Sequence, residues 1–250
     1  MSNLRAAARR AAASAPEKEI LSFESYGQRY WLKRGRKTGS NPLHYAAWGL
    51  SRFPLLIPVS HQSRQEALRH ESGKIRRLES LGIPVPRILI EENDWFVMSH
   101  TGPTLRHLLY RKDRNETLTL SAFEALGRLH AMGEYHGGSQ LRNLTWTNEQ
   151  IHFIDFEENF SEEVPLETLQ LRDLFLLLFS LAKDHIPLDY RRHIDRYRTI
   201  SGNEDFDRRL RDLFARLGWL EKIITFSPIW SLLDKDTKAT YRIIQEIKQL

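Results

Sequence analysis

The chain contains no cysteine, so it can form neither disulfide bonds nor thiolate metal sites. This composition fits a reducing compartment, and we expect a cytoplasmic protein. Long apolar runs are also missing, because no segment approaches the roughly 18 apolar residues that a membrane-spanning helix needs. The densest apolar run, 171–182, contains Arg172 and Asp173, and therefore predicts a buried helix of a globular protein.

A targeting sequence is likewise not evident at the amino terminus. Residues 1–14 carry arginine and alanine without acidic residues, but they lack an apolar core of signal-peptide length. We therefore expect residues 1–17 to form a flexible tail, either frayed or helical.

The chain has no strong excess of charge of one sign. Its 37 lysines and arginines against 32 acidic residues give a net charge of +5. This modest excess favours phosphorylated or acidic partners, but no basic face of the kind that binds nucleic acids stands out. The apolar and charged fractions, 41% and 28%, are those of an ordinary soluble globular protein.

Strand-like segments come first along the chain and helical segments follow, which predicts an α+β protein of two lobes. We expect a small β-rich lobe with one long helix at 18–98, a hinge at 99–104 and a larger helical lobe at 105–250. The hinge is indicated by a polar stretch with glycine and proline. The helices expected beyond it span 105–110, 118–132, 168–183, 187–199, 204–217 and 236–249.

A hairpin is predicted at the start of the small lobe. Two β-prone runs, 20–23 and 29–32, flank a turn at 25–28. The single glycine of this turn, Gly27, is a poor cradle for phosphate groups. Lys33 follows the second run, and the strand pattern alone favours a solvated lysine at a strand end.

The long helix of this lobe carries a carboxylate that needs an explanation. Ser63 and Glu66 form a capping box at its start, and Gly82 closes its end. Glu71 completes the apolar stripe of the helix, whose other members are Leu68, Ile75 and Leu78. A carboxylate on a buried face needs a cationic partner, and Lys33 is the natural one.

The segment 34–60 joins a basic cluster to aromatic and apolar residues, interrupted by prolines at 42, 54 and 58. Basic residues beside aromatic ones suit contact with a membrane surface or an amphiphilic substrate. A helical insertion packed on the domain explains the same residues equally well.

A polar loop at 136–143 is followed by two short apolar runs and then by Asp155. Asn143 and Asp155 each close a loop or a β-type run, so both can direct oxygen ligands at one divalent cation. Mg²⁺ prefers such a site, with phosphate oxygens and water completing its coordination. The pattern therefore predicts a magnesium site.

In this order and spacing, the features resemble the protein-kinase-like superfamily. The chain is most similar to the bacterial lipopolysaccharide-core kinases, the Kdo and heptose kinase group, and to the compact RIO-type and tRNA-modification-associated kinases. The residues that carry the resemblance lie between about 20 and 185. They include Lys33, Glu71, the pair His136-Gly137, Asn143, Asp155 and the pair Arg172-Asp173.

The resemblance implies a bilobal kinase-like fold that uses ATP and Mg²⁺. It implies that Lys33 contacts the nucleotide phosphates while Glu71 fixes its rotamer, and that Asn143 and Asp155 bind the metal. It also implies that the stretch after the last strand of the small lobe contacts adenine; this stretch is Met98, Ser99, His100 and Thr101. Asp173 would anchor the loop that begins at His136.

One residue departs from the family pattern. The catalytic aspartate should stand two residues after His136, where this chain has Gly138. A general base contributes about 10²–10⁴-fold to a reaction rate, so its loss slows a kinase without necessarily abolishing it. Glu157, Glu158 and the more remote Glu134 are the candidate replacements, and Glu157 also replaces the glycine of the family's Asp-Phe-Gly motif.

Three functions fit these residues. The first is an ATP-dependent kinase for a sugar of the lipopolysaccharide core or a similar small acceptor, in the cytoplasm or peripheral on the inner membrane. The second, suggested by Gly138, is a pseudokinase that binds nucleotide or a partner. The third is a compact Ser/Thr protein kinase. Specific nucleic-acid binding is not expected.

Overall fold

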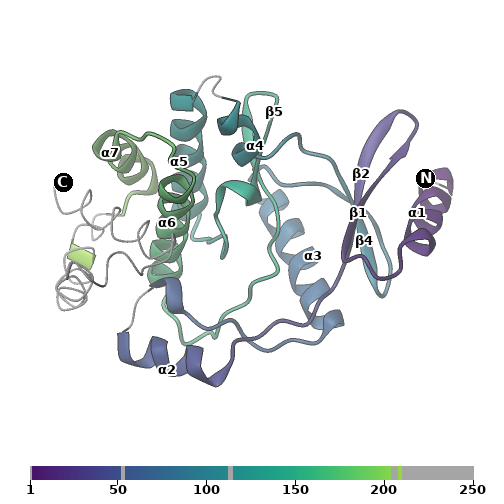
Figure 1. The fold of residues 1–250 in the computed structure, drawn as a ribbon, viewed down its shortest axis with the longest axis horizontal. Helices are drawn as coiled ribbons and strands as arrows, with labels where there is room; N and C mark the ends of the chain where they lie inside the picture. Colours follow the sequence, from purple (N-terminus) through teal and green to yellow (C-terminus); the bar gives the residue numbers. More distant parts are fainter. Residues whose placement is uncertain (1, 52–53, 112–114, 204–207, 210–250) are drawn as a thin grey trace, which may run out of the picture.

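The computed structural model describes residues 2–51, 54–111, 115–203 and 208–209 of the 250. A small antiparallel sheet lies toward one end of the molecule and a group of helices at the other (Figure 1). The α+β fold expected from the order of segments is thereby confirmed. The helix expected at 236–249 lies outside the described residues, and so does the helix expected at 204–217 except for residues 208–209. The exact bounds of the small lobe (18–98), the hinge (99–104) and the large lobe (105–250) stay predictions.

The sheet of the small lobe contains four strands in the order β1-β2-β4-β3: β1 (Ile20–Ser25), β2 (Gln28–Arg34), β3 (Ile88–Glu91) and β4 (Trp95–Ser99). The predicted hairpin is formed by β1 and β2. Its two-residue turn, Tyr26-Gly27, has φ angles of 51° and 71°, as hairpin turns that match the strand twist require.

The long helix α3 (Arg64–Ser80) packs on one face of this sheet. The predicted capping box is present: the Ser63 side chain accepts from the Glu66 N–H, and the Glu66 carboxylate accepts from the Ser63 N–H. The apolar stripe and Glu71 are both buried, as the helical periodicity predicted.

The opposite face of the sheet is covered by α1 (Ser2–Ser14). Neighbouring residues of β4 point to opposite faces, so Trp95 and Val97 pack with Ala8 of α1 while Phe96 belongs to the core on the α3 side. Of the two forms expected for the tail 1–17, frayed or helical, the structure shows the helical one over residues 2–14, and this helix packs on the sheet. Ala8 is fully buried, and the small alanines of this segment let the helix lie close to the strands.

Segment 34–60 forms a helical insertion, one of the two alternatives that its sequence left open. It contains α2 (Pro42–Ser51) and the short helix η1 (Pro54–Leu56), and α2 lies at the lower edge of the molecule in Figure 1. Ile57 is buried together with Phe160 and Leu169 of the large lobe. Leu43 and Leu50 of α2 are instead 77% and 90% exposed.

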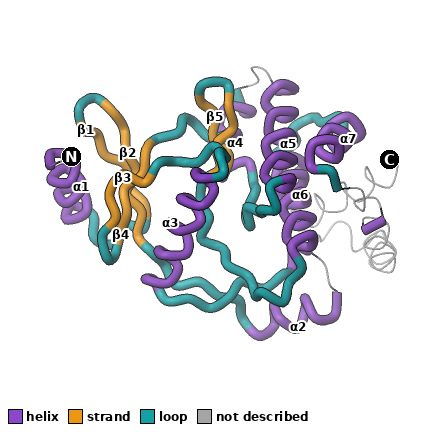
Figure 2. The backbone as a smooth tube through the Cα atoms, turned by 180° about the vertical axis from the view of Figure 1, so that it is seen from behind, coloured by secondary structure: helices purple, strands orange, loops and turns teal. Residues whose placement is uncertain are grey.

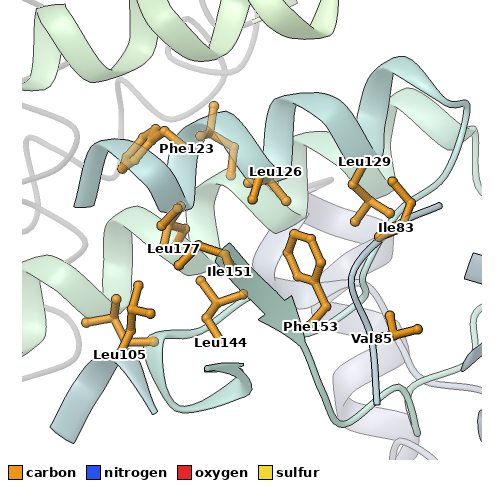
Figure 3. Packing of buried hydrophobic residues seen from close by; sticks show 14 of the residues in the cluster. Ile83, Val85, Leu105, Phe123, Leu126, Leu129, Leu144, Ile151, Phe153 and Leu177 are labelled. Carbon is orange, nitrogen blue, oxygen red and sulfur yellow. The ribbon is translucent and has the colours of Figure 1, made fainter. Parts of the chain in front are cut away.

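The large lobe consists of helices around a short hairpin (Figure 2). Its elements are α4 (Leu105–Tyr110), α5 (Asn115–Ala131), η2 (Leu141–Asn143), β5 (Leu144–Thr147), β6 (Gln150–Phe153), α6 (Leu166–Lys183) and α7 (Tyr190–Ser201). In Figure 3, Phe123, Leu126 and Leu129 of α5 lie along the hairpin residues Leu144, Ile151 and Phe153. Leu177 of α6 belongs to the same core, so the run 171–182 is a buried helix as predicted.

Candidate functional site

Three charged side chains from distant parts of the chain meet between the lobes. Nζ of Lys33, near the end of β2, lies 2.7 Å from Oε1 of Glu71 in α3 and 2.5 Å from Oδ1 of Asp155, which follows β6. The lysine is buried, so it is not the solvated residue that the strand pattern alone allowed. Its pairing with Glu71 is the contact expected from the buried face of the helix.

The electrostatics of this cluster favour the charged forms of Lys33 and Asp155, whereas burial raises the pKa of Glu71 above its usual range. Burial by itself would lower the pKa of Lys33, but Glu71 and Asp155 outweigh burial and raise it above the ordinary lysine value. Burial would similarly raise the pKa of Asp155, but the ion pair with Lys33 holds it below its usual range. The ionised form of Asp155 is the one that can bind a metal ion.

Asp155 has a strained backbone, with a φ of 69° in the left-handed region. Residues other than glycine reach this region at a cost of about 1–2 kcal/mol. Its position is fixed by the next residue: Phe156 is fully buried, its N–H donates to Oε1 of Glu71, and its ring lies 4.6 Å from that of His136. Strain of this kind is common at functional sites.

The loop 136–143 is attached to α6 through Asp173, as the resemblance implied. The carboxylate of Asp173 accepts the N–H groups of His136, at 2.5 Å, and Gly137, at 2.8 Å. Arg172 donates to the carbonyl of Gly137 and lies 2.8 Å from Oε2 of Glu158. Two adjacent residues of one helix therefore hold the start of the loop.

His136 has a structural position inside this loop. Its Nδ1 accepts the N–H of Gly138, so its Nε2–H donates to the carbonyl of Ile154 at 3.0 Å. Burial, helped by the nearby Lys74, lowers the pKa of His136 to about 4 and keeps the ring neutral. The histidine thus joins the loop to the strand that ends before Asp155.

Asn143 is the last residue of the loop, and its side-chain oxygen takes no part in the hydrogen bonds that hold the loop together. Its Nδ2 donates to the carbonyl of Gly138, and its main-chain carbonyl accepts the N–H of Ile154. No described residue donates to Oδ1 of Asn143, which leaves this oxygen for a ligand. The amide oxygen and the ionised Asp155 form a donor set that suits Mg²⁺ if substrate oxygens and water complete it. Within the described part of the chain, no group of three His, Cys, Asp or Glu side chains could hold a metal by itself.

The hinge leads directly from β4 to α4. Met98 is buried in the core between the lobes, and Thr101 donates no backbone hydrogen bond to any residue that the structure describes. Gly102 has a φ of +89°, and a Cβ atom there would lie 2.2 Å from the carbonyl oxygen of Trp146. This close approach holds the hinge against β5. Whether 98–101 contacts adenine stays a prediction.

Two residues near the site escaped the sequence analysis. The indole N–H of Trp31 donates to Nδ1 of His100, which joins β2 to the hinge. Lys74 donates to the carbonyl of His136 at 3.1 Å and lies 3.6 Å from the centre of the Tyr135 ring. Lys74 could have been noticed, because it follows Glu71 by three residues and so shares its helix face.

A cavity of about 510 Å³ adjoins the cluster on the side of segment 34–60. It is lined by Glu19, Arg36, Lys37, Thr38, Gly39, Ser40, Val59, Arg64, Glu157 and Glu158. The basic residues of the insertion therefore face acidic residues that follow Asp155.

Comparison with protein families gave no matching family model. A Haemophilus influenzae protein named only as uncharacterized is 26% identical over 172 residues, which are 67% of this chain and 64% of that protein. A probable bifunctional tRNA threonylcarbamoyladenosine biosynthesis protein of Methanocorpusculum labreanum is 29% identical over 121 residues, 48% of this chain and 22% of that protein. The chain thus spans less than two thirds of both relatives.

Among solved structures, the fold matches WaaP in complex with acyl carrier protein, with a TM-score of 0.50 and 18% identity. The match covers 81% of this chain and 82% of the WaaP chain. At this level of identity the match shows a shared fold. The chain therefore has a protein-kinase-like fold, and the resemblance found in its sequence is confirmed at the level of the fold.

Proposed function

We propose that this protein is an ATP- and Mg²⁺-dependent phosphotransferase that phosphorylates a sugar of the lipopolysaccharide core or a similar small acceptor. The observation that carries the proposal is the cluster of Lys33, Glu71 and Asp155, built from three separate elements of a protein-kinase-like fold. Such a cluster positions phosphate groups and neutralises the charge that develops during phosphoryl transfer.

In this proposal, the ammonium group of Lys33 binds phosphate oxygens of the nucleotide, and Glu71 keeps it in place. Asp155 and Oδ1 of Asn143 would together hold the metal ion. A magnesium ion held there supplies positive charge that neutralises the phosphate oxygens. The backbone of 98–101 would contact adenine, and the support is the N–H of Thr101, which has no hydrogen-bond partner among the residues that the structure describes.

Nucleotide binding is tested by thermal unfolding. ATP with MgCl₂ should raise the melting temperature of the wild-type protein, because a ligand that binds only the folded state stabilises it. Asp155→Ala should lose most of this shift. Asp94→Ala, which removes an exposed aspartate in the turn between β3 and β4, serves as the matched control and should keep it. A wild-type protein without any shift contradicts the proposal.

Transfer is tested with γ-labelled ATP and lipopolysaccharide-core oligosaccharide. Label should enter the oligosaccharide with wild-type protein and not with Lys33→Ala. Gly138 favours one alternative, a pseudokinase that binds nucleotide without transferring phosphate. A magnesium-dependent thermal shift without label transfer and without release of ADP identifies this alternative.

We further propose that the protein works at the inner surface of the cytoplasmic membrane, where an amphiphilic acceptor would be found. The support is α2, whose exposed Leu43 and Leu50 are seven residues apart and therefore share one helix face. Arg36 and Lys37 precede this helix. No helix in the described part of the chain is long and apolar enough to cross a membrane.

A further inference from the structure

The backbone at Gly138 does not itself require glycine. Its φ angle lies outside the left-handed range, unlike that of Gly137 at +103°. A Cβ atom at position 138 would lie 3.4 Å from Nδ2 of Asn143 and 4.0 Å from Cδ of Glu158, which are ordinary contact distances. An aspartate would therefore fit the backbone, but the Glu158 carboxyl group already stands within reach of its side chain.

Glu158 is held in this position by Arg172 of α6 and lies beside the loop 136–143. Oε2 lies 2.8 Å from Nη2 of Arg172, and the guanidinium group lies 4.9 Å from the centre of the Phe160 ring. The Cβ atom of Glu158 is also near Gly137. Although Arg172 lies 2.8 Å from Oε2, this buried oxygen has no hydrogen-bond partner among the described residues, so it can accept a hydrogen bond. The side chain is 34% exposed, so a substrate can reach it.

The other two acidic candidates are engaged elsewhere. Glu157 pairs with Arg36 and lies 3.9 Å from Lys33, on the side where the nucleotide phosphates are expected. Glu134 is 6% exposed and bonds Arg77 at 2.5 Å. Of the three carboxylates considered from the sequence, Glu158 is the one that adjoins position 138.

The cavity described above reaches the same carboxylate. Glu158 lines it, and Lys37 and Arg64 line it as well. Neither of these two cations forms an ion pair with any residue in the described ranges. A hydroxyl compound that carries an anionic group can therefore pair with them while its hydroxyl group approaches Glu158.

We infer that Glu158 replaces the missing aspartate as the catalytic base, and that the adjoining cavity binds an anionic hydroxyl acceptor, such as a phosphorylated sugar. The inference rests on the proposed phosphotransferase function. The acceptor hydroxyl gives its proton to Glu158 while its oxygen forms a bond to the γ-phosphorus of ATP. The bond from that phosphorus to the β,γ-bridging oxygen breaks, and ADP leaves with the electron pair.

The decisive experiment moves the carboxylate from one position to the other. Glu158→Gln should reduce label transfer to core oligosaccharide by about 10²–10⁴-fold. It should reduce the release of ADP in the absence of oligosaccharide by about the same factor. The double variant Gly138→Asp with Glu158→Gln should regain at least about tenfold of that loss, because the new carboxylate occupies nearly the same place. Glu163→Gln, in the exposed loop that follows, is the control and should behave as wild type.

The thermal shift with ATP and MgCl₂ is the second readout, and it should be unchanged in both variants. Full activity of Glu158→Gln overturns the inference and leaves the phosphotransferase standing. A loss that Gly138→Asp does not recover, with the thermal shift intact, assigns Glu158 a structural role and also overturns it. Wild-type protein that binds nucleotide but releases no ADP overturns it as well, and absence of any thermal shift overturns both proposals.

The cavity has its own test within the same assay. Lys37→Ala combined with Arg64→Ala should raise the KM for a phosphorylated core oligosaccharide at least about tenfold, since two charge-assisted contacts are lost. The KM for ATP should stay the same. An unchanged KM for the oligosaccharide contradicts this assignment of the acceptor site.

Discussion

At the scale of single residues, the site depends on buried charges that are paired across the chain. Glu71 is 2% exposed and contacts both Lys33 and the N–H of Phe156. A buried charge is tolerated because its partner is buried with it, and removal of one partner leaves the other uncompensated.

Replacing Glu71 by glutamine should therefore lower the free energy of unfolding by about 3 kcal/mol, the low end for a broken buried pair, because Asp155 still faces Lys33. Glu79→Gln in the same helix is the matched control. Its partner Arg87 is 78% exposed, and such surface pairs contribute about 0–1 kcal/mol. Urea unfolding of both variants measures the difference, and equal losses would contradict the assigned burial.

At the scale of elements, the hinge and α1 are fixed by close backbone contacts. The hinge between β4 and α4 approaches β5 at Gly102, and α1 approaches the sheet at Ala8. Position 102 has no room for a side chain and position 8 only for a very small one, and each has a matched position elsewhere that lacks the contact.

Gly102→Ala should destabilise the protein by several kcal/mol, since its Cβ meets the Trp146 carbonyl and the backbone has a positive φ. Gly133→Ala shares the positive φ, +72°, but has nothing within 4 Å of the added atom. It should cost only about 1 kcal/mol. Thermal unfolding of the two variants separates the clash from the backbone strain, and similar melting temperatures would refute the close approach of hinge and strand.

Ala8→Glu should destabilise the small lobe, because it buries a carboxylate against Leu32 and Val97 without a partner. Ala6→Glu, on the exposed side of the same helix, should leave the melting temperature within about 1 °C of wild type, as surface substitutions usually have small effects. If both variants unfold like wild type, α1 does not pack on the sheet.

At the scale of the whole molecule, histidines of both lobes are kept neutral by burial. Burial lowers the pKa of His70 in α3, His136 in the loop, His152 in β6 and His193 in α7. When the pH falls below about 6.5, these histidines bind protons in the unfolded chain before they do so in the folded protein. Stability is therefore expected to fall with pH in this range.

His136 has a pKa of about 4 in the folded protein, so the stability that its neutral form contributes is fully lost only near pH 4. Its share is about 3 kcal/mol between pH 6.5 and 4, since one pKa unit corresponds to about 1.4 kcal/mol. His136→Asn should remove this share of the pH dependence, whereas His107→Asn, at an exposed position of α4, should keep it. Urea unfolding at several pH values measures the slope, and identical slopes for wild type and His136→Asn would contradict a buried neutral ring.

Much of the local structure could be predicted from the sequence because short-range rules set it. The capping box of α3, the turn of the first hairpin and the burial of α6 follow from side-chain chemistry and periodicity within a few residues. The pairing of Lys33 with Glu71 was also predictable, since a carboxylate in an apolar stripe needs a cation.

The tertiary structure decided what depends on contacts between distant residues. The sequence did not indicate that α1 would cover the sheet, because an alanine-rich segment has no apolar stripe that marks one of its faces for burial. It left three carboxylates as substitutes for the missing aspartate, and only the packing of Arg172 and Gly137 around Glu158 distinguishes one of them. Periodicity assigns a residue to a face of its own element, whereas the partner of that face depends on how the whole chain packs.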